Sequence, residues 1–116
     1  MTGIILALDV TAPDRALRIA QECAPHIDGI KIGYPLVLSA GLPFVSCLGD
    51  LGLPLIADFK VADIPNTNRL IAEQVFSAGF NALICQGFTG EDAVTACVET
   101  SHAMGGTCMV VSEMSH

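Results

Sequence analysis

Five short apolar runs recur along this chain at similar intervals, and this pattern constrains the fold more than any other feature. The runs cover residues 4–10, 29–34, 55–60, 82–86 and 108–113. Each is rich in Ile, Leu, Val or Ala, which is typical of parallel strands that are covered on both faces. The segments between them carry apolar residues at helical spacing. This alternation predicts an α/β fold built on a parallel sheet.

Helix start and stop signals occupy the connecting segments. Thr11 is the expected N-cap of the first helix, with Pro13 and Asp14 in its first turn. Glycines mark the expected ends of the last two helices. Two short helices are expected over residues 35–40 and 42–51. Two longer helices are expected from about residue 65 to about residue 79 and from about residue 90 to about residue 105.

Two architectures fit this order of elements: an open doubly wound sheet and a closed barrel. The Gly-x-Gly-x-x-Gly motif is absent, which disfavours a dinucleotide-binding open sheet. Polar residues instead gather where strands end, at the rim on which barrels build active sites. They are Asp9, Lys31, Asp58, Lys60, Gln86, Glu113 and Ser115. Because a full barrel takes ~250 residues, residues 1–116 are expected to form the N-terminal part of a single (β/α)₈ TIM-barrel domain, its first four βα units plus strand 5.

Composition excludes several classes of function. A net charge of −7 with only five Lys and Arg residues argues against nucleic acid as a partner. No apolar run approaches the ~18 residues that a membrane span needs. The N-terminus lacks a basic segment and Asp9 interrupts its apolar run, so a signal peptide is not expected. The five cysteines show no Cys-x-x-Cys spacing, which favours free thiols in the cytoplasm over a zinc site.

The densest cluster of chemically active residues is the pattern Asp58-x-Lys60-x-x-Asp63. Side chains two apart on a strand share a face, so Asp58 and Lys60 are expected to point the same way. Lys31, the other lysine of the chain, ends the preceding predicted strand. The result would be a balanced tetrad in which alternating charges keep each group ionised. Such a site suits decarboxylation, because the ammonium can stabilise a carbanion and then protonate it.

Spacing alone leaves a structural alternative open, because ion-pair networks at strand ends also occur without catalysis. The surrounding sequence is more specific. Residues 6–9, 31–38, 58–68, 87–88 and 113–116 resemble, in the same order, stretches of the orotidine 5′-phosphate decarboxylases, especially the short archaeal-type enzymes. The resemblance implies decarboxylation of orotidine 5′-monophosphate to uridine 5′-monophosphate in pyrimidine biosynthesis, with neither a metal nor an organic cofactor.

The resemblance also implies roles for individual residues that contact the nucleotide substrate. Asp9 would bind a ribose hydroxyl, and Lys31 would contact the ribose and the carboxylate network. Asp58 would lie against the substrate carboxylate, and Lys60 would donate the proton to C6 of the pyrimidine. Ser115 would contact the pyrimidine ring.

Three further residues would act in a homodimer. Asp63, Ile64 and Thr67 resemble the residues that a family member contributes to the active site of its partner. Gln86 departs from the family pattern, which often has histidine before the Gly-Phe pair. The arginine and the closing loop with which the family holds the substrate phosphate have no counterpart in these 116 residues.

Two other functions remain open at this stage. Sugar-phosphate decarboxylases and aldolases share the Asp-x-Lys-x-x-Asp pattern on the same barrel and use Mg²⁺, although residues 31–33 and 64–67 favour the orotidine branch. Alternatively, the chain is a half-barrel without activity of its own that serves only as an assembly unit.

Overall fold

The computed structural model describes residues 2–113, which contain one five-stranded sheet with strands in the order β1-β2-β3-β4-β5. Every pair of neighbouring strands is parallel. The strands are β1 (Ile5–Leu8), β2 (Gly29–Ile32), β3 (Leu55–Val61), β4 (Ala82–Gln86) and β5 (Thr107–Val111). The predicted alternation of strands and helices in a parallel sheet is therefore confirmed.

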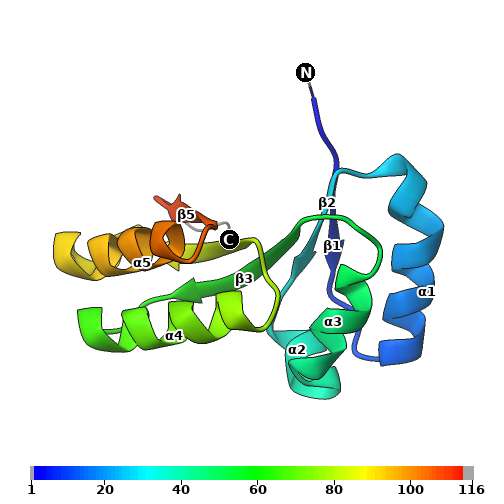
Figure 1. Ribbon diagram of the computed structural model, residues 1–116, viewed down its shortest axis with the longest axis horizontal. Helices are drawn as coiled ribbons and strands as arrows, with labels where there is room; N and C mark the ends of the chain where they lie inside the picture. The colour runs from blue at the N-terminus through cyan, green and yellow to red at the C-terminus, as the bar shows by residue number, and fades with distance from the viewer. Residues whose placement is uncertain (1, 114–116) are drawn as a thin grey trace.

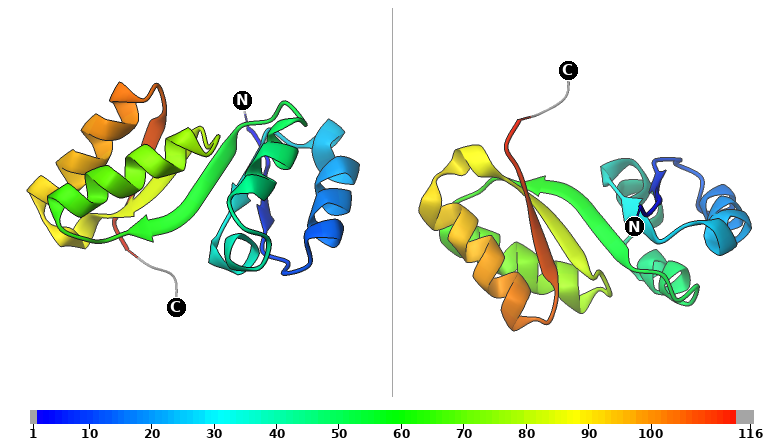
Figure 2. Two further views of the ribbon diagram at one scale, coloured as in Figure 1. Left: turned by 60° about the horizontal axis from the view of Figure 1, so that its bottom comes forward. Right: turned by 90° about the horizontal axis from the view of Figure 1, so that it is seen from above.

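Helices connect the strands and form two groups (Figure 1). The first group packs near β1 and β2, whereas the last two long helices lie side by side at the other end of the sheet. Figure 2 shows the long strand β3 running between the two groups. The helical segments are α1 (Pro13–Cys23), η1 (Ala24–His26), α2 (Tyr34–Ala40), α3 (Pro43–Gly49), α4 (Pro65–Ser77), η2 (Gly87–Thr89) and α5 (Glu91–Ala103).

One row of side chains crosses the sheet and forms the centre of the core. Leu8, Ile32, Ala57 and Leu83 are in register on successive strands, and each is at most 1% exposed. The row pairs next with Cys108 on β5, which is partly buried. These residues pack with Ala16, Leu36, Val45 and Val75 of the helices. The helices therefore cover this face of the sheet, which explains why its side chains are apolar.

The other face of the sheet is less covered. Ile5 on β1 is 53% exposed and Met109 on β5 is 38% exposed. Both lie on the face opposite the core row, since Ile5 pairs with Gly29 and Met109 with Ile84. Lys31 belongs to the same face because it is in register with Ala7 and Ile56. In a closed barrel, this face would line the interior.

Two details of the predicted boundaries are wrong. The N-cap of α1 is Ala12 rather than Thr11, and no side chain caps this helix. Pro13 at the start of α1 has no N–H to satisfy, which lowers the need for a capping side chain. Tyr34 was expected in a strand but begins α2, because the extended conformation ends at Gly33.

Candidate active site

Two lysines and one aspartate meet at the carboxyl end of the sheet. Asp58 on β3 lies between them, with Lys60 Nζ 2.8 Å from its Oδ1 and Lys31 Nζ 3.4 Å from its Oδ2. The Asp58 side chain is 15% exposed, whereas those of Lys31 and Lys60 are 35% and 38% exposed. The carboxylate is thus largely shielded while both ammonium groups remain accessible to a small molecule.

The environment of Asp58 favours its charged form. Burial alone would raise the pKa of Asp58. The hydrogen bond from Lys60, together with the positive charges of Lys60 and Lys31, outweighs burial and holds the pKa of Asp58 below its ordinary value. Asp58 therefore presents a fixed negative charge at neutral pH, next to two positive groups.

A β-bulge in β3 shapes this cluster. Ala57 pairs with Leu83 and Val61 with Cys85, so four residues of β3 advance against two residues of β4. Within this irregular stretch, Lys60 has a φ of 45°, in the left-handed region. Asp58 and Lys60 do meet, but the regular alternation assumed from the sequence is wrong for this stretch. Bulges often lie beside active sites, where they redirect a side chain.

Asp9 lies beside the same cluster, immediately after β1. A Cβ atom added to Gly33 would be 3.3 Å from Asp9 Oδ1 and 3.8 Å from the backbone oxygen of Asp58. Gly33 thus allows the carboxylate of Asp9 to approach the ends of β2 and β3. Gly33 was not predicted as a site residue, although its position just after a strand that ends in polar residues was the available signal.

Asp63 does not join the lysines within this chain. Among the ion pairs of residues 2–113, none links Asp63 to Lys31 or Lys60. Instead, Asp63 Oδ1 accepts a hydrogen bond from the Ile64 amide at 2.7 Å. The expected tetrad is therefore a trio within one chain. The Ile64 side chain is 65% exposed, and Thr67 lies in the first turn of α4.

Asn68 anchors this loop and was also missed by pattern analysis. It is 1% exposed, and its Oδ1 accepts a hydrogen bond from the Asp63 amide at 2.9 Å. Its Nδ2 donates to the backbone oxygen of Ala93 on α5 at 3.1 Å. A polar residue at a position of α4 that faces the core was the signal that could have revealed it.

The remaining predicted residues lie in three different settings. Gln86 is 4% exposed at the end of β4, on the face of the sheet that carries Lys31. Ser115 falls outside the described residues. The three arginines, Arg15, Arg18 and Arg69, are exposed, and Arg69 pairs with Glu73 at 2.7 Å.

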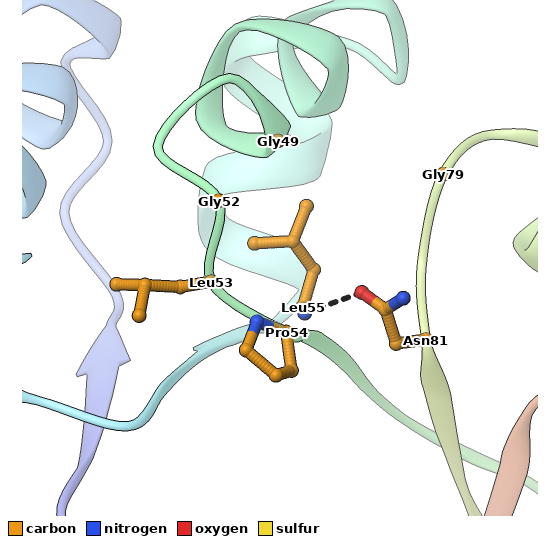
Figure 3. Close-up of a pocket in the computed structure, with 7 residues that line it drawn as sticks. All are labelled: Gly49, Gly52, Leu53, Pro54, Leu55, Gly79 and Asn81. Carbon is orange, nitrogen blue, oxygen red and sulfur yellow. Dashed lines mark hydrogen bonds between the residues drawn. The ribbon is translucent and has the colours of Figure 1, made fainter.

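A depression of about 350 Å³ lies at the opposite end of the sheet (Figure 3). It is lined mainly by glycines and by residues 53–55, where β3 begins, and Asn81 Oδ1 accepts a hydrogen bond from the Leu55 amide there. None of the charged residues borders it. Residues 2–113 contain no group of three His, Cys, Asp or Glu side chains that could hold a metal ion, and none of their helices could span a membrane.

Comparisons with known proteins identify relatives of this chain. The chain is 56% identical over 115 residues to the orotidine 5′-phosphate decarboxylase of Methanosarcina mazei, covering 99% of this chain and 52% of that protein. The crystal structure of the orotidine 5′-monophosphate decarboxylase of Methanocaldococcus jannaschii with the inhibitor BMP superposes with a TM-score of 0.95 at 43% identity, covering 100% of this chain and 54% of that one. The crystal structure of the orotidine 5′-phosphate decarboxylase of Pyrococcus horikoshii superposes with a TM-score of 0.90 at 45% identity, covering 97% of this chain and 52% of that one.

The chain thus spans about half the length of the relatives that it matches, and its five strands correspond to about half of a (β/α)₈ barrel. This confirms the predicted fold class. The family model described as "Orotidine 5'-phosphate decarboxylase / HUMPS family" matches residues 2–116. On the strength of this match and of the relatives, the chain belongs to the orotidine 5′-phosphate decarboxylase / HUMPS family.

Proposed function

We propose that this chain carries the reacting groups of an orotidine 5′-monophosphate decarboxylase. The observation that carries the proposal is the ionised Asp58 held between Lys31 and Lys60 at the carboxyl end of the sheet. The names of the relatives support the same reaction. The product would be uridine 5′-monophosphate, formed in pyrimidine biosynthesis without a metal or an organic cofactor.

The charges suggest how the reaction proceeds. A substrate carboxylate placed against Asp58 is repelled, and this repulsion disappears when the carbon–carboxylate bond breaks and carbon dioxide leaves. The electron pair of that bond stays on C6 of the pyrimidine, where the Lys60 ammonium stabilises it by charge. Lys60 then donates a proton to C6 and recovers one from solvent, which balances the reaction.

Other residues bind the substrate in this proposal. Asp9, which lies beside Gly33, would accept a hydrogen bond from a ribose hydroxyl. Lys31 would contact the ribose while it holds Asp58. Ser115 would contact the pyrimidine ring.

A second copy would complete the site in a cytoplasmic homodimer. The absence of an ion pair between Asp63 and the lysines in residues 2–113, and the 65% exposure of Ile64, support a role for this loop across an interface. Asp63 would then supply the fourth charge of the tetrad to its partner, with Ile64 and Thr67 lining the same site. A mixture of one variant lacking Lys60 and one lacking Asp63 should regain activity by forming hybrid dimers, because one site of each hybrid then combines an intact Lys60 with an intact Asp63.

Metal dependence separates this proposal from the sugar-phosphate branch of the family. The test uses a hybrid in which this chain continues after residue 116 with the part of the Methanosarcina mazei relative that it does not cover; we call this hybrid the completed barrel. Turnover of orotidine 5′-monophosphate is measured by absorbance after exhaustive EDTA treatment. Full activity is expected, whereas a loss that Mg²⁺ restores would assign the chain to the metal-dependent branch.

A further inference from the structure

Lys60 has an unusual backbone conformation. It is the only non-glycine residue with a positive φ among residues 2–113. A left-handed conformation is unfavourable for a non-glycine residue, so it persists only where neighbouring contacts enforce it. The contacts that hold the Phe59–Lys60 peptide therefore set the point from which the Lys60 side chain reaches Asp58.

Tyr34, at the start of α2, makes these contacts. Its hydroxyl donates a hydrogen bond to the backbone oxygen of Phe59 at 2.5 Å, which is the carbonyl of the peptide that leads into Lys60. Its ring also stacks on the Phe59 ring, with centroids 5.1 Å apart and planes 15° apart. The Phe59 and Phe80 rings in turn form an edge-to-face pair with centroids 5.6 Å apart, and Phe80 is 3% exposed. The bulge is thus tied both to α2 and to the core.

We propose that Tyr34 is a positioning residue for Lys60, which it keeps in the left-handed conformation through the Phe59 carbonyl. Tyr34 itself touches no reacting group in this assignment. The catalytic consequence rests on the proposed function, whereas the effect on the geometry of Lys60 and Asp58 does not.

The ionisation of Tyr34 is compatible with this role. Burial raises the pKa of Tyr34, and this effect exceeds the opposing influence of the Lys60 charge. The phenol therefore stays protonated and remains a donor throughout the neutral pH range. The influence of both Lys60 and Asp58 on Tyr34 also shows that the three side chains share one electrostatic environment.

The variant Tyr34→Phe separates the hydrogen bond from the ring stacking, because it removes only the hydroxyl. In the completed barrel, we expect kcat to fall about three- to tenfold, the scale of one hydrogen bond, while KM changes less than about twofold. Independently of activity, Lys60 should withdraw from Asp58, so the pKa of Asp58, read from its ¹³Cγ chemical shift, should rise toward its ordinary value.

Ser39→Ala is the matched control. Ser39 also lies on α2 and donates a hydrogen bond to a backbone oxygen, that of Thr11, at 2.5 Å. Removing it should loosen α2 without changing the pKa of Asp58. The inference is overturned if Tyr34→Phe leaves the Asp58 titration unchanged, or if Ser39→Ala shifts it equally. An inactive completed barrel would refute the proposed function, and the Asp58 titration would still decide the role of Tyr34.

Discussion

At the residue scale, the site depends on one carboxylate that two ammonium groups contact from either side. Lys31 comes from β2 and Lys60 from β3, so the pairing of neighbouring strands creates the cluster. Both ammonium groups are held by direct contact with the Asp58 carboxylate. Substitution of any one of the three therefore changes the electrostatic environment of the other two.

Replacing Lys60 should abolish most of the catalysis. In the completed barrel, Lys60→Ala is expected to lower kcat/KM at least ~10³-fold, because a general acid and a stabilising charge are lost together. Steady-state kinetics gives the value, and circular dichroism checks that the fold persists. Arg69→Ala, which removes a cation from the exposed pair with Glu73, should leave kcat/KM unchanged. Activity of the Lys60 variant within tenfold of the parent would show that this lysine is structural.

Asp58 should make the free energy of unfolding depend on pH in the acidic range. Its pKa in the folded chain lies below the ordinary 3.8, so its stabilising contribution is fully present above pH 3.8. Below that pH, the unfolded chain takes up the proton first, and the contribution disappears as the pH falls through the lowered pKa. Urea unfolding of the completed barrel at several pH values should show this loss. Asp58→Asn should be less stable at neutral pH and should lack this part of the acid dependence; identical pH curves would contradict the assignment.

At the scale of elements, the loop between β3 and α4 is held by the helix that follows it. The buried Asn68 side chain joins the Asp63 amide to the Ala93 carbonyl, so α4, α5 and the loop are connected by one residue. The loop therefore has a defined conformation although Asp63 and Ile64 are exposed. This connection would keep both residues ready to contact a partner subunit.

Removing that connection should destabilise the fold and the loop together. Asn68→Ala removes both hydrogen bonds of a fully buried side chain and leaves its space unfilled, which costs about 2 kcal/mol or more. Equilibrium unfolding of the completed barrel in urea measures the loss. Asn66→Ala is the comparison, because Asn66 is exposed and its side chain accepts a hydrogen bond from the exposed Arg69 side chain. A stability cost equal for the two variants would show that burial of Asn68 has no special role.

At the scale of the whole molecule, the sheet has two edge strands, β1 and β5. The face of the sheet opposite the core row carries exposed apolar side chains, including Ile5 and Met109. Edge strands and apolar surfaces of this kind promote association with other chains. In a closed barrel both features would be covered, because closure pairs the edge strands and turns this face toward the interior.

The isolated polypeptide 1–116 should therefore be inactive and not monomeric. It holds the charged trio, but in the proposed reaction binding energy from a remote phosphate site would be needed to assemble the reactive geometry. Adding a separately expressed remainder of the Methanosarcina mazei relative should restore part of the activity by completing the barrel. An absorbance assay for orotidine 5′-monophosphate and light scattering test both claims. A monodisperse, active monomer of 1–116 would contradict them; failure of complementation with a well-folded remainder would favour a pure assembly unit.

The sequence determined the order of elements and indicated the charged residues that form the candidate site. Apolar runs and helical spacing are local patterns, so five strands and their connecting helices could be predicted from them, as could the rim on which Asp58 and Lys60 lie. Boundaries that depend on a single residue were less certain. Thr11 has the chemistry of a cap, yet Ala12 occupies the position, because the path of the chain after β1 decides which residue lies there.

Only the tertiary structure decided how the charges meet. The bulge in β3 arises from its register with β4, and that register depends on contacts between residues far apart in the chain. The left-handed Lys60, the hydrogen bond from Tyr34 across 25 positions and the buried bridge of Asn68 to Ala93 follow from the same packing. The position of the Asp63 loop depends in part on the same packing, since Asn68, which accepts the hydrogen bond of the Asp63 amide, is itself bonded to the distant Ala93 carbonyl of α5. Local patterns carry no information about such distant contacts, which is why the residues were predicted and their geometry was not.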